Sequence, residues 1–152
     1  MKQKRPYLLK LIMAIIFLSS IGLAQNQKNY FGISYDQYLA ASASNLTNSP
    51  AFTIHLATVN DNFELRFSFS YPVFLISADA LVNLQIEKDF RVYAGAGLGI
   101  IPIVSVFEMH TVLGTELKLE GFGIFTEWQV FSFLTNKSPS GSKIRLGFNI
   151  PF

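Results

Sequence analysis

The residues "FELRFSFSY" at positions 63–71 alternate between apolar and polar side chains without a break. Successive side chains of a β-strand point to opposite faces, so this period of two predicts a strand with one apolar face. Seven further segments show the same alternation, less regularly in the fifth, sixth and seventh of the eight. The eight predicted strands lie at residues 30–38, 51–59, 63–71, 77–87, 90–100, 112–120, 122–131 and 143–152.

The chain is rich in apolar residues and poor in charge. Half of its residues are hydrophobic and 14% are charged, against about 25% charged in soluble domains. Beyond the N-terminal segment, no apolar run reaches the roughly 18 residues that a membrane helix needs. Strands of about 9–11 residues cross a bilayer when tilted, and in lipid they must close into a barrel. The sequence therefore predicts an all-β fold, an eight-stranded antiparallel up-and-down transmembrane β-barrel.

The N-terminal segment has the three-part pattern of a secretory signal peptide. A basic start, "MKQKRPYLLK", precedes "LIMAIIFLSSIGLA", an apolar stretch of 14 residues. Gly22 and Ala24 occupy the −3 and −1 positions of a small-residue cleavage site. A retained anchor is the alternative, for which the stretch is short. We expect residues 1–24 to be a cleavable signal peptide and residues 25–152 to be the barrel domain.

The charge balance argues against a nucleic-acid partner. Four of the twelve Lys and Arg residues lie among the first ten positions, so the rest of the chain has eight bases against ten acids. The chain has no cysteine, which excludes a disulfide framework and a lipid-modified N-terminal cysteine. We find no phosphate-binding glycine loop and no cluster with metal-ligand spacing, so no cofactor and no metal are expected.

The connections between predicted strands differ at the two ends. Those around Asp61, Lys88 and Gly121 are short, whereas three of the four at the other end are longer, "IPIVSVFEM" among them. Short periplasmic turns opposite longer outer loops are typical of outer-membrane barrels.

Aromatic residues gather at both ends of the predicted strands, as they do at the two membrane interfaces of such barrels. The short-turn end has Phe31, Phe63, Phe90, Phe122 and Phe152. The residues predicted for a belt at the other end are Tyr38, Phe52, Tyr71, Phe107 and Phe133.

The alternation alone leaves open which face points outward. A soluble secreted barrel would bury the Phe and Leu face, but the polar faces hold too few charges to cover a water-facing surface. In a membrane barrel the polar face must point inward, because a charge on the lipid face costs about 2–4 kcal/mol at the midplane. We therefore expect an ion-paired, hydrogen-bonded interior plug. Its predicted members are Glu64, Arg66, Asp79, Glu116, Lys118, Glu127 and Arg145.

The last ten residues, "KIRLGFNIPF", resemble the C-terminal insertion signal of bacterial outer-membrane proteins, a terminal aromatic preceded by hydrophobics at alternate positions. The matching residues are Ile144, Leu146, Phe148, Ile150 and Phe152. With "VYAGAGLGI", the closing strands also resemble small OmpA/OmpX-like eight-stranded barrels. The resemblance implies an outer-membrane location among lipid and lipopolysaccharide. It also implies that the barrel-assembly machinery reads the last strand, which pairs with the first.

Two histidines are the candidates for catalysis. Some barrels of this size modify lipid A with a histidine, a serine and an acid, but His110 has no serine–asparagine pair nearby in sequence, and His55 is expected to face the lumen. We therefore predict no catalytic residues. The expected role is non-enzymatic, in envelope integrity or surface contact by a monomer in a diderm bacterium. A lipid A-modifying outer-membrane enzyme is the alternative, followed by a soluble secreted ligand-binding barrel.

Overall fold

The computed structural model describes residues 28–41, 50–60, 62–135 and 140–152; the predicted signal peptide lies outside them. These residues form eight β-strands in one sheet, and among them no helix is long and apolar enough to cross a membrane. The strands are β1 (Lys28–Ala41), β2 (Ala51–Asn60), β3 (Phe63–Tyr71), β4 (Leu75–Glu87), β5 (Phe90–Ile101), β6 (Val106–Leu119), β7 (Phe122–Leu134) and β8 (Ser140–Pro151).

Each strand pairs antiparallel with the next strand in sequence, and β8 pairs with β1 to close the barrel. The closing pair runs from Tyr30 opposite Pro151 to Ala41 opposite Gly141. Beyond it, the backbone N–H of Phe152 donates to the carbonyl oxygen of Asn29 at 3.1 Å. The prediction of an eight-stranded antiparallel barrel is therefore confirmed.

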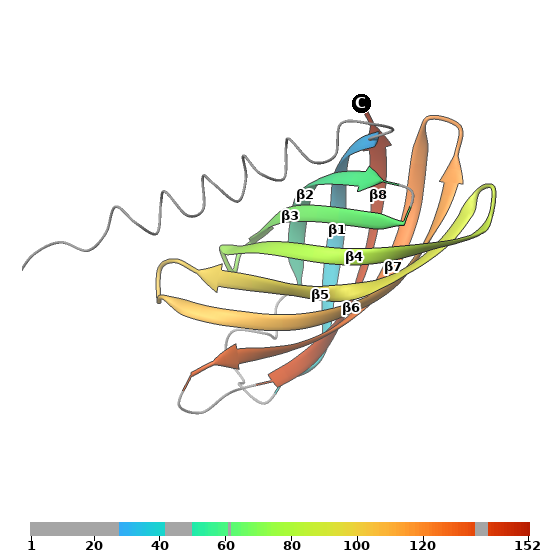
Figure 1. Ribbon diagram of the computed structural model, residues 1–152. Coiled ribbons are helices and arrows are strands. Elements are labelled where there is room, and N and C mark those ends of the chain that lie inside the picture. The colour runs from blue at the N-terminus through green and yellow to red at the C-terminus, as the bar shows by residue number, and fades with distance from the viewer. Residues whose placement is uncertain (1–27, 42–49, 61, 136–139) are drawn as a thin grey trace, which may run out of the picture.

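The pairing registers fix how far the strands tilt. A path through paired residues leaves β5 at Phe90, passes once around the barrel and returns to β5 at Ile100. This stagger of ten residues is about 33 Å along the strand, against about 38 Å around eight strand spacings, which gives a tilt of about 40°. In Figure 1, β3, β4 and β5 accordingly run across the front while β1 and β8 run steeply behind them.

The connections follow the predicted asymmetry with one correction. Two residues join β2 to β3, β4 to β5, and β6 to β7, and every connection at the other end is longer. The connection predicted to be long between β5 and β6 is only residues 102–105, because β6 begins at Val106. The ends are called the turn end and the loop end below.

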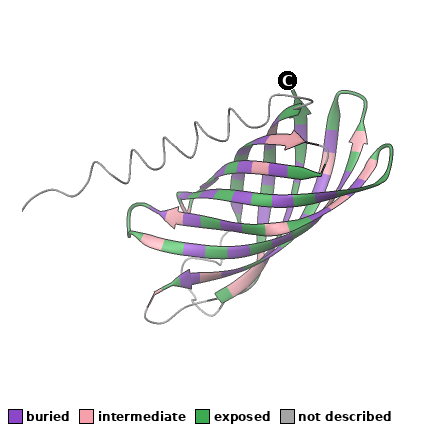
Figure 2. Ribbon diagram, viewed as in Figure 1, coloured by how far each residue is buried: buried purple, intermediate pink, exposed green. Residues whose placement is uncertain are grey.

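Burial alternates along each strand, as the stripes of buried and exposed residues in Figure 2 show. On β3, Phe63 and Phe67 are 39% and 47% exposed, while Glu64 and Arg66 are 1% and 0% exposed. Most large apolar residues thus point away from the barrel axis, and the charged residues of the strands point mostly into the interior.

Two aromatic residues predicted for the loop-end belt lie elsewhere. Phe133 is 4% exposed because, like Phe131, it falls on the inward positions of β7. Tyr38 is partly buried, and its ring meets that of Phe131 edge-on at 5.7 Å. The other three, Phe52, Tyr71 and Phe107, are 54–59% exposed.

The misplaced aromatics belong to an apolar cluster that fills the interior at the loop end. Its members are Leu75, Ile101, Phe131 and Phe133, with Tyr38, Val73 and Val106 packed against them. A smaller apolar group of Leu81, Tyr93 and Val112 lies further inside. Between and below these groups, the interior is polar and charged.

Candidate functional site

A continuous apolar path crosses the outer wall of the barrel from one end to the other. The path of paired residues from Phe90 to Ile100 contains no polar side chain. At a tilt of about 40° its ten-residue stagger climbs about 25 Å along the axis, the height of the apolar band of membrane barrels. The residues on the path are Phe90, Leu117, Ile124, Phe148, Ile33, Ile54, Phe69, Ile76 and Ile100.

Charge is sorted sharply between the interior and the turn end. Among the described residues, the exposed charged side chains are confined to the turn end: Lys28, Glu87, Lys88, Asp89 and Glu120. Ten charged residues are buried in the interior, six acids and four bases. They are Asp36, Glu64, Arg66, Asp79, Arg91, Glu108, Glu116, Glu127, Lys143 and Arg145.

The centre of the interior is a chain of ion pairs that joins strands on opposite sides of the barrel. Arg66 donates from Nη2 to Glu64 Oε1 at 2.8 Å and from Nη1 to Glu127. Arg145 binds Asp36 through two bonds of 2.9 and 3.0 Å, and its Nη1 lies 3.4 Å from Glu127 Oε2. Each of these charges therefore has an opposite charge within reach, as burial requires.

A second cluster lies nearer the turn end. Arg91 pairs with Glu116 and donates from Nη1 to Glu64 Oε2 and Asn83 Oδ1, at 2.8 and 2.9 Å. Asn149 donates to Glu116 Oε1 at 2.7 Å. Because Glu64 contacts both Arg66 and Arg91, the two clusters form one network.

A histidine lies between two carboxylates on the loop-end side. His110 Nε2 is 2.7 Å from Asp79 Oδ1, and its Nδ1 is 3.0 Å from Glu108 Oε1. His110 Nε2 and Asp79 Oδ1 are hydrogen-bonded, whereas the geometry between His110 Nδ1 and Glu108 Oε1 gives no hydrogen bond.

At two places in the interior, side chains from two strands hydrogen-bond to each other across a glycine. In each case the glycine belongs to the strand that lies between those two strands. Gly97 lies opposite both Asp79 and His110, and a Cβ at Gly97 would be 2.2 Å from Asp79 Oδ1. Similarly, His55 Nε2 and Asn149 Oδ1 meet at 2.8 Å over Gly32, whose Cβ would be 2.0 Å from that nitrogen. Glycine is required at both positions because side chains two strands apart must meet against its backbone.

Of the seven residues predicted for the lumen, the structure buries six: Glu64, Arg66, Asp79, Glu116, Glu127 and Arg145. Lys118 is half-buried near the turn end, where its Nζ donates to Gln85 Oε1 at 3.1 Å, so it lies apart from the network. It is the second-last residue of β6, beyond the point where the barrel wall encloses side chains.

The prediction missed four buried charges: Asp36, Arg91, Glu108 and Lys143. Asp36 and Lys143, 3.3 Å apart, lie on polar faces that the alternation already assigned. Arg91 is the second residue of the Gly- and Ala-rich strand β5, whose sequence leaves the facing ambiguous. The five hydrophobics of the predicted C-terminal signal all point outward, with exposed fractions from 41% at Ile144 to 75% at Phe152.

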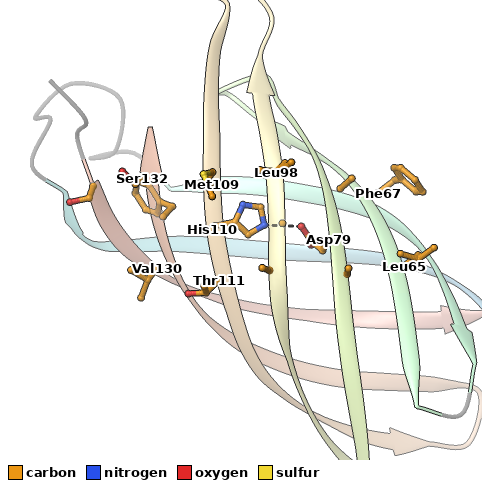
Figure 3. A pocket seen from close by; sticks show the side chains of 15 residues that line it. Leu65, Phe67, Asp79, Leu98, Met109, His110, Thr111, Val130 and Ser132 are labelled. Atoms are coloured by element: carbon orange, nitrogen blue, oxygen red, sulfur yellow. Dashed lines mark hydrogen bonds and ion pairs between the residues drawn. The ribbon is translucent and has the colours of Figure 1, made fainter. Parts of the chain in front are cut away.

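The outer wall is hollowed on the side of β3–β8, as Figure 3 shows. The recess is about 620 Å³, and its walls are formed mainly by outward side chains such as Leu65, Phe67, Leu98 and Met109. Asp79 and His110 line its floor, although both are at least 95% buried and paired to each other. A smaller recess of about 240 Å³ lies beside Trp128.

No group of three His, Cys, Asp or Glu residues in the described part of the chain could hold a metal ion. The buried carboxylates instead face basic side chains, histidine or amides. The arrangement therefore fixes the strands to one another across the interior.

Comparison with known proteins supports the architecture. No protein-family model and no curated protein sequence matches the chain. A solved structure of a de novo designed transmembrane β-barrel superposes with a TM-score of 0.54 at 9% sequence identity, over 82% of this chain and 95% of the designed one. This likeness shows that the chain has the closed eight-stranded antiparallel barrel fold.

Proposed function

We propose that this protein is an integral barrel of a bacterial outer membrane. In this proposal residues 1–24 direct export and are removed, and the strands run up and down across the membrane. Its role is non-enzymatic, in envelope integrity or in surface contact through the loop end. The designed structural neighbour, described as transmembrane, supports the membrane part of the proposal.

The observation that carries the proposal is the reversal of the usual distribution of polarity. Val82, Leu84 and Leu98 are 61–62% exposed on the outer wall, while Arg66, Asp36 and their partners are buried. In water, this distribution would leave a continuous apolar band exposed and remove ten charges from solvent, both of which are unfavourable. In a bilayer, the same wall faces acyl chains and the charges remain paired inside.

The interior supports a plugged lumen. An eight-stranded barrel is only wide enough for its own side chains, and here a connected ion-pair network fills the middle. The apolar cluster of Leu75, Ile101, Phe131 and Phe133 fills the loop end. The burial of His110 and its hydrogen bond to Asp79 support a structural rather than a catalytic role for this histidine.

The single tryptophan of the chain gives a direct test. Trp128 is 51% exposed on the outer wall, so in vesicles it should contact acyl chains. We expect lipids with brominated chains to quench most of its fluorescence, and aqueous iodide to quench little of it.

A matched control moves the reporter to the turn end. In the double variant Trp128→Phe, Lys88→Trp, the indole lies at an exposed charged turn, and we expect iodide to quench it. Strong iodide quenching of Trp128 itself in the wild-type protein would show that this wall faces water, and would refute the membrane assignment. Recovery of the wild-type protein in the soluble fraction of lysed cells would do the same.

A further inference from the structure

The larger recess is a trough between two neighbouring rows of outward side chains. The lower row follows the pairing of Leu65, Ala80, Ala96, Thr111 and Val130 across β3–β7. The upper row lies two residues further toward the loop end on each strand. It consists of Phe67, Ala78, Leu98, Met109, Ser132 and Ser140.

Small side chains keep the trough open. Ala80, Ala96 and Thr111 stand side by side in the lower row, and Asp79, Gly97 and His110 supply the floor between the rows. Two rows that are two residues apart are separated by about 6.6 Å. Because this spacing is common to every pair of outward rows, the room for a hydrocarbon chain comes from the small side chains of Ala78, Ala80 and Ala96, which leave a recess of about 620 Å³.

The stagger of the barrel makes the trough slope through the membrane. Each step from one strand to the next along a row rises about 3 Å toward the loop end, because strands about 4.8 Å apart tilt by about 40°. The five steps from Phe67 to Ser140 therefore rise about 15 Å. This equals half of a hydrocarbon core of about 30 Å, the depth of one leaflet.

The polarity of the lining changes along this slope. At the deep end on β3–β5, the outward side chains are Leu, Phe and Ala. The hydroxyl groups in the lining belong to Thr111, Ser132 and Ser140, on the strands toward the loop end. The trough is thus hydrocarbon at mid-membrane depth and gains hydroxyl groups where lipid ester groups begin.

We propose that this trough binds one acyl chain of a membrane lipid from the loop-side leaflet. The chain enters beside Ser132 and Ser140, lies across the strands over Ala96, and ends against Leu65 and Phe67. The inference rests on the proposed membrane location and adds a specific lipid site to it. The small side chains, the recess volume and the polarity gradient of the trough distinguish this site from the rest of the wall.

The test compares two substitutions on the same strand. Ala96→Phe fills the trough, while Ala94→Phe places the same side chain two residues away on the same exposed face but outside the lining. The purified barrels are titrated in mild detergent with palmitoyl-oleoyl phosphatidylethanolamine, and bound lipid is counted by native mass spectrometry. We expect one lipid on the wild type and on Ala94→Phe, and about tenfold weaker binding to Ala96→Phe, a loss of about 1.4 kcal/mol.

A parallel titration with lipid A identifies which lipid supplies the chain, and Thr111→Leu is a second, milder filling variant if Ala96→Phe does not fold. Equal lipid binding by both alanine variants would overturn the inference. So would a dimer that only Ala96→Phe disrupts, because the occupant would then be a second copy. These results are independent of Trp128 quenching, which tests the membrane location itself.

Discussion

At the scale of single residues, glycine on the inner face is as informative as charge. Gly97 and Gly32 each lie beneath a pair of side chains from the two flanking strands. The missing side chain lets groups two strands apart bond directly. In sequence these glycines indicate only that the backbone is approached closely, because the groups that approach come from distant parts of the chain.

We predict that Gly97→Ala destabilises the barrel by about 1–3 kcal/mol, the cost of leaving buried polar partners unpaired. Its methyl group would lie 2.2 Å from Asp79 Oδ1 and 2.4 Å from His110 Nε2, so the pair must open. Gly99→Ala is the control on the same strand and face, since its nearest contact is the flexible Leu75 Cδ1 at 2.8 Å. Urea unfolding in lipid vesicles measures both, and equal losses would argue against the cross-link.

A second prediction at this scale concerns the network. Arg66→Met leaves the buried carboxylates of Glu64 and Glu127 without their shared guanidinium. We expect a loss of about 3–5 kcal/mol, as for other broken buried ion pairs. Lys88→Met, which removes an exposed charge at the turn end, is expected to change stability by less than about 0.5 kcal/mol. Similar urea midpoints for the two variants would show that the network contributes little.

At the scale of the strand, β8 shows how much a local pattern decides. Its alternating hydrophobics predict an outward apolar face, and Leu146 and Phe148 are 56% and 52% exposed. β5 shows the opposite case: its Gly and Ala residues carry little facing information. Its facing is decided by pairing with β4 and β6, which turns Arg91 and Tyr93 inward.

The depth of the outward positions on β8 gives a graded prediction. Leu146 lies four residues further from the turn end than Ile150, about 10 Å deeper along the axis. We expect Leu146→Arg to cost about 2–4 kcal/mol and Ile150→Arg about 0–1 kcal/mol, as charges do at the midplane and the interface. Refolding yield into vesicles and urea unfolding check this, and a greater loss at Ile150 would mean that the membrane position is wrong.

At the scale of the whole molecule, the closure of the barrel and the stagger of its strands together decide which residues meet in the interior. Asp36 and Arg145 lie 109 positions apart in sequence but pair through two hydrogen bonds, because β1 and β8 close the barrel. The ion-pair network and the loop-end apolar cluster each bring together residues that lie far apart in the sequence. The contacts inside the barrel are therefore a property of the assembled sheet.

We predict that the protein in planar bilayers gives no stable large conductance, because an eight-stranded barrel is only wide enough for its own side chains and in the proposed function these close the lumen. Trp128 quenching by brominated lipid in a parallel vesicle sample shows that the protein has inserted. Stable, large current steps from inserted protein would contradict the plugged lumen.

The sequence by itself determined the strands, most of their facing and the inward placement of Glu64, Arg66, Asp79, Glu116, Glu127 and Arg145, because a period of two is a local property of the chain. It misplaced Tyr38 and Phe133, and Lys118 lies on the inner face of β6 but apart from the network, since how far the wall encloses a strand end depends on neighbouring strands. Only the tertiary structure decided the ten-residue stagger, the partners of each buried charge and the sloping trough on the outer wall. The stagger depends on the closure of β8 on β1, and the charge partners and the trough depend on the pairing of several strands, so no single segment encodes them.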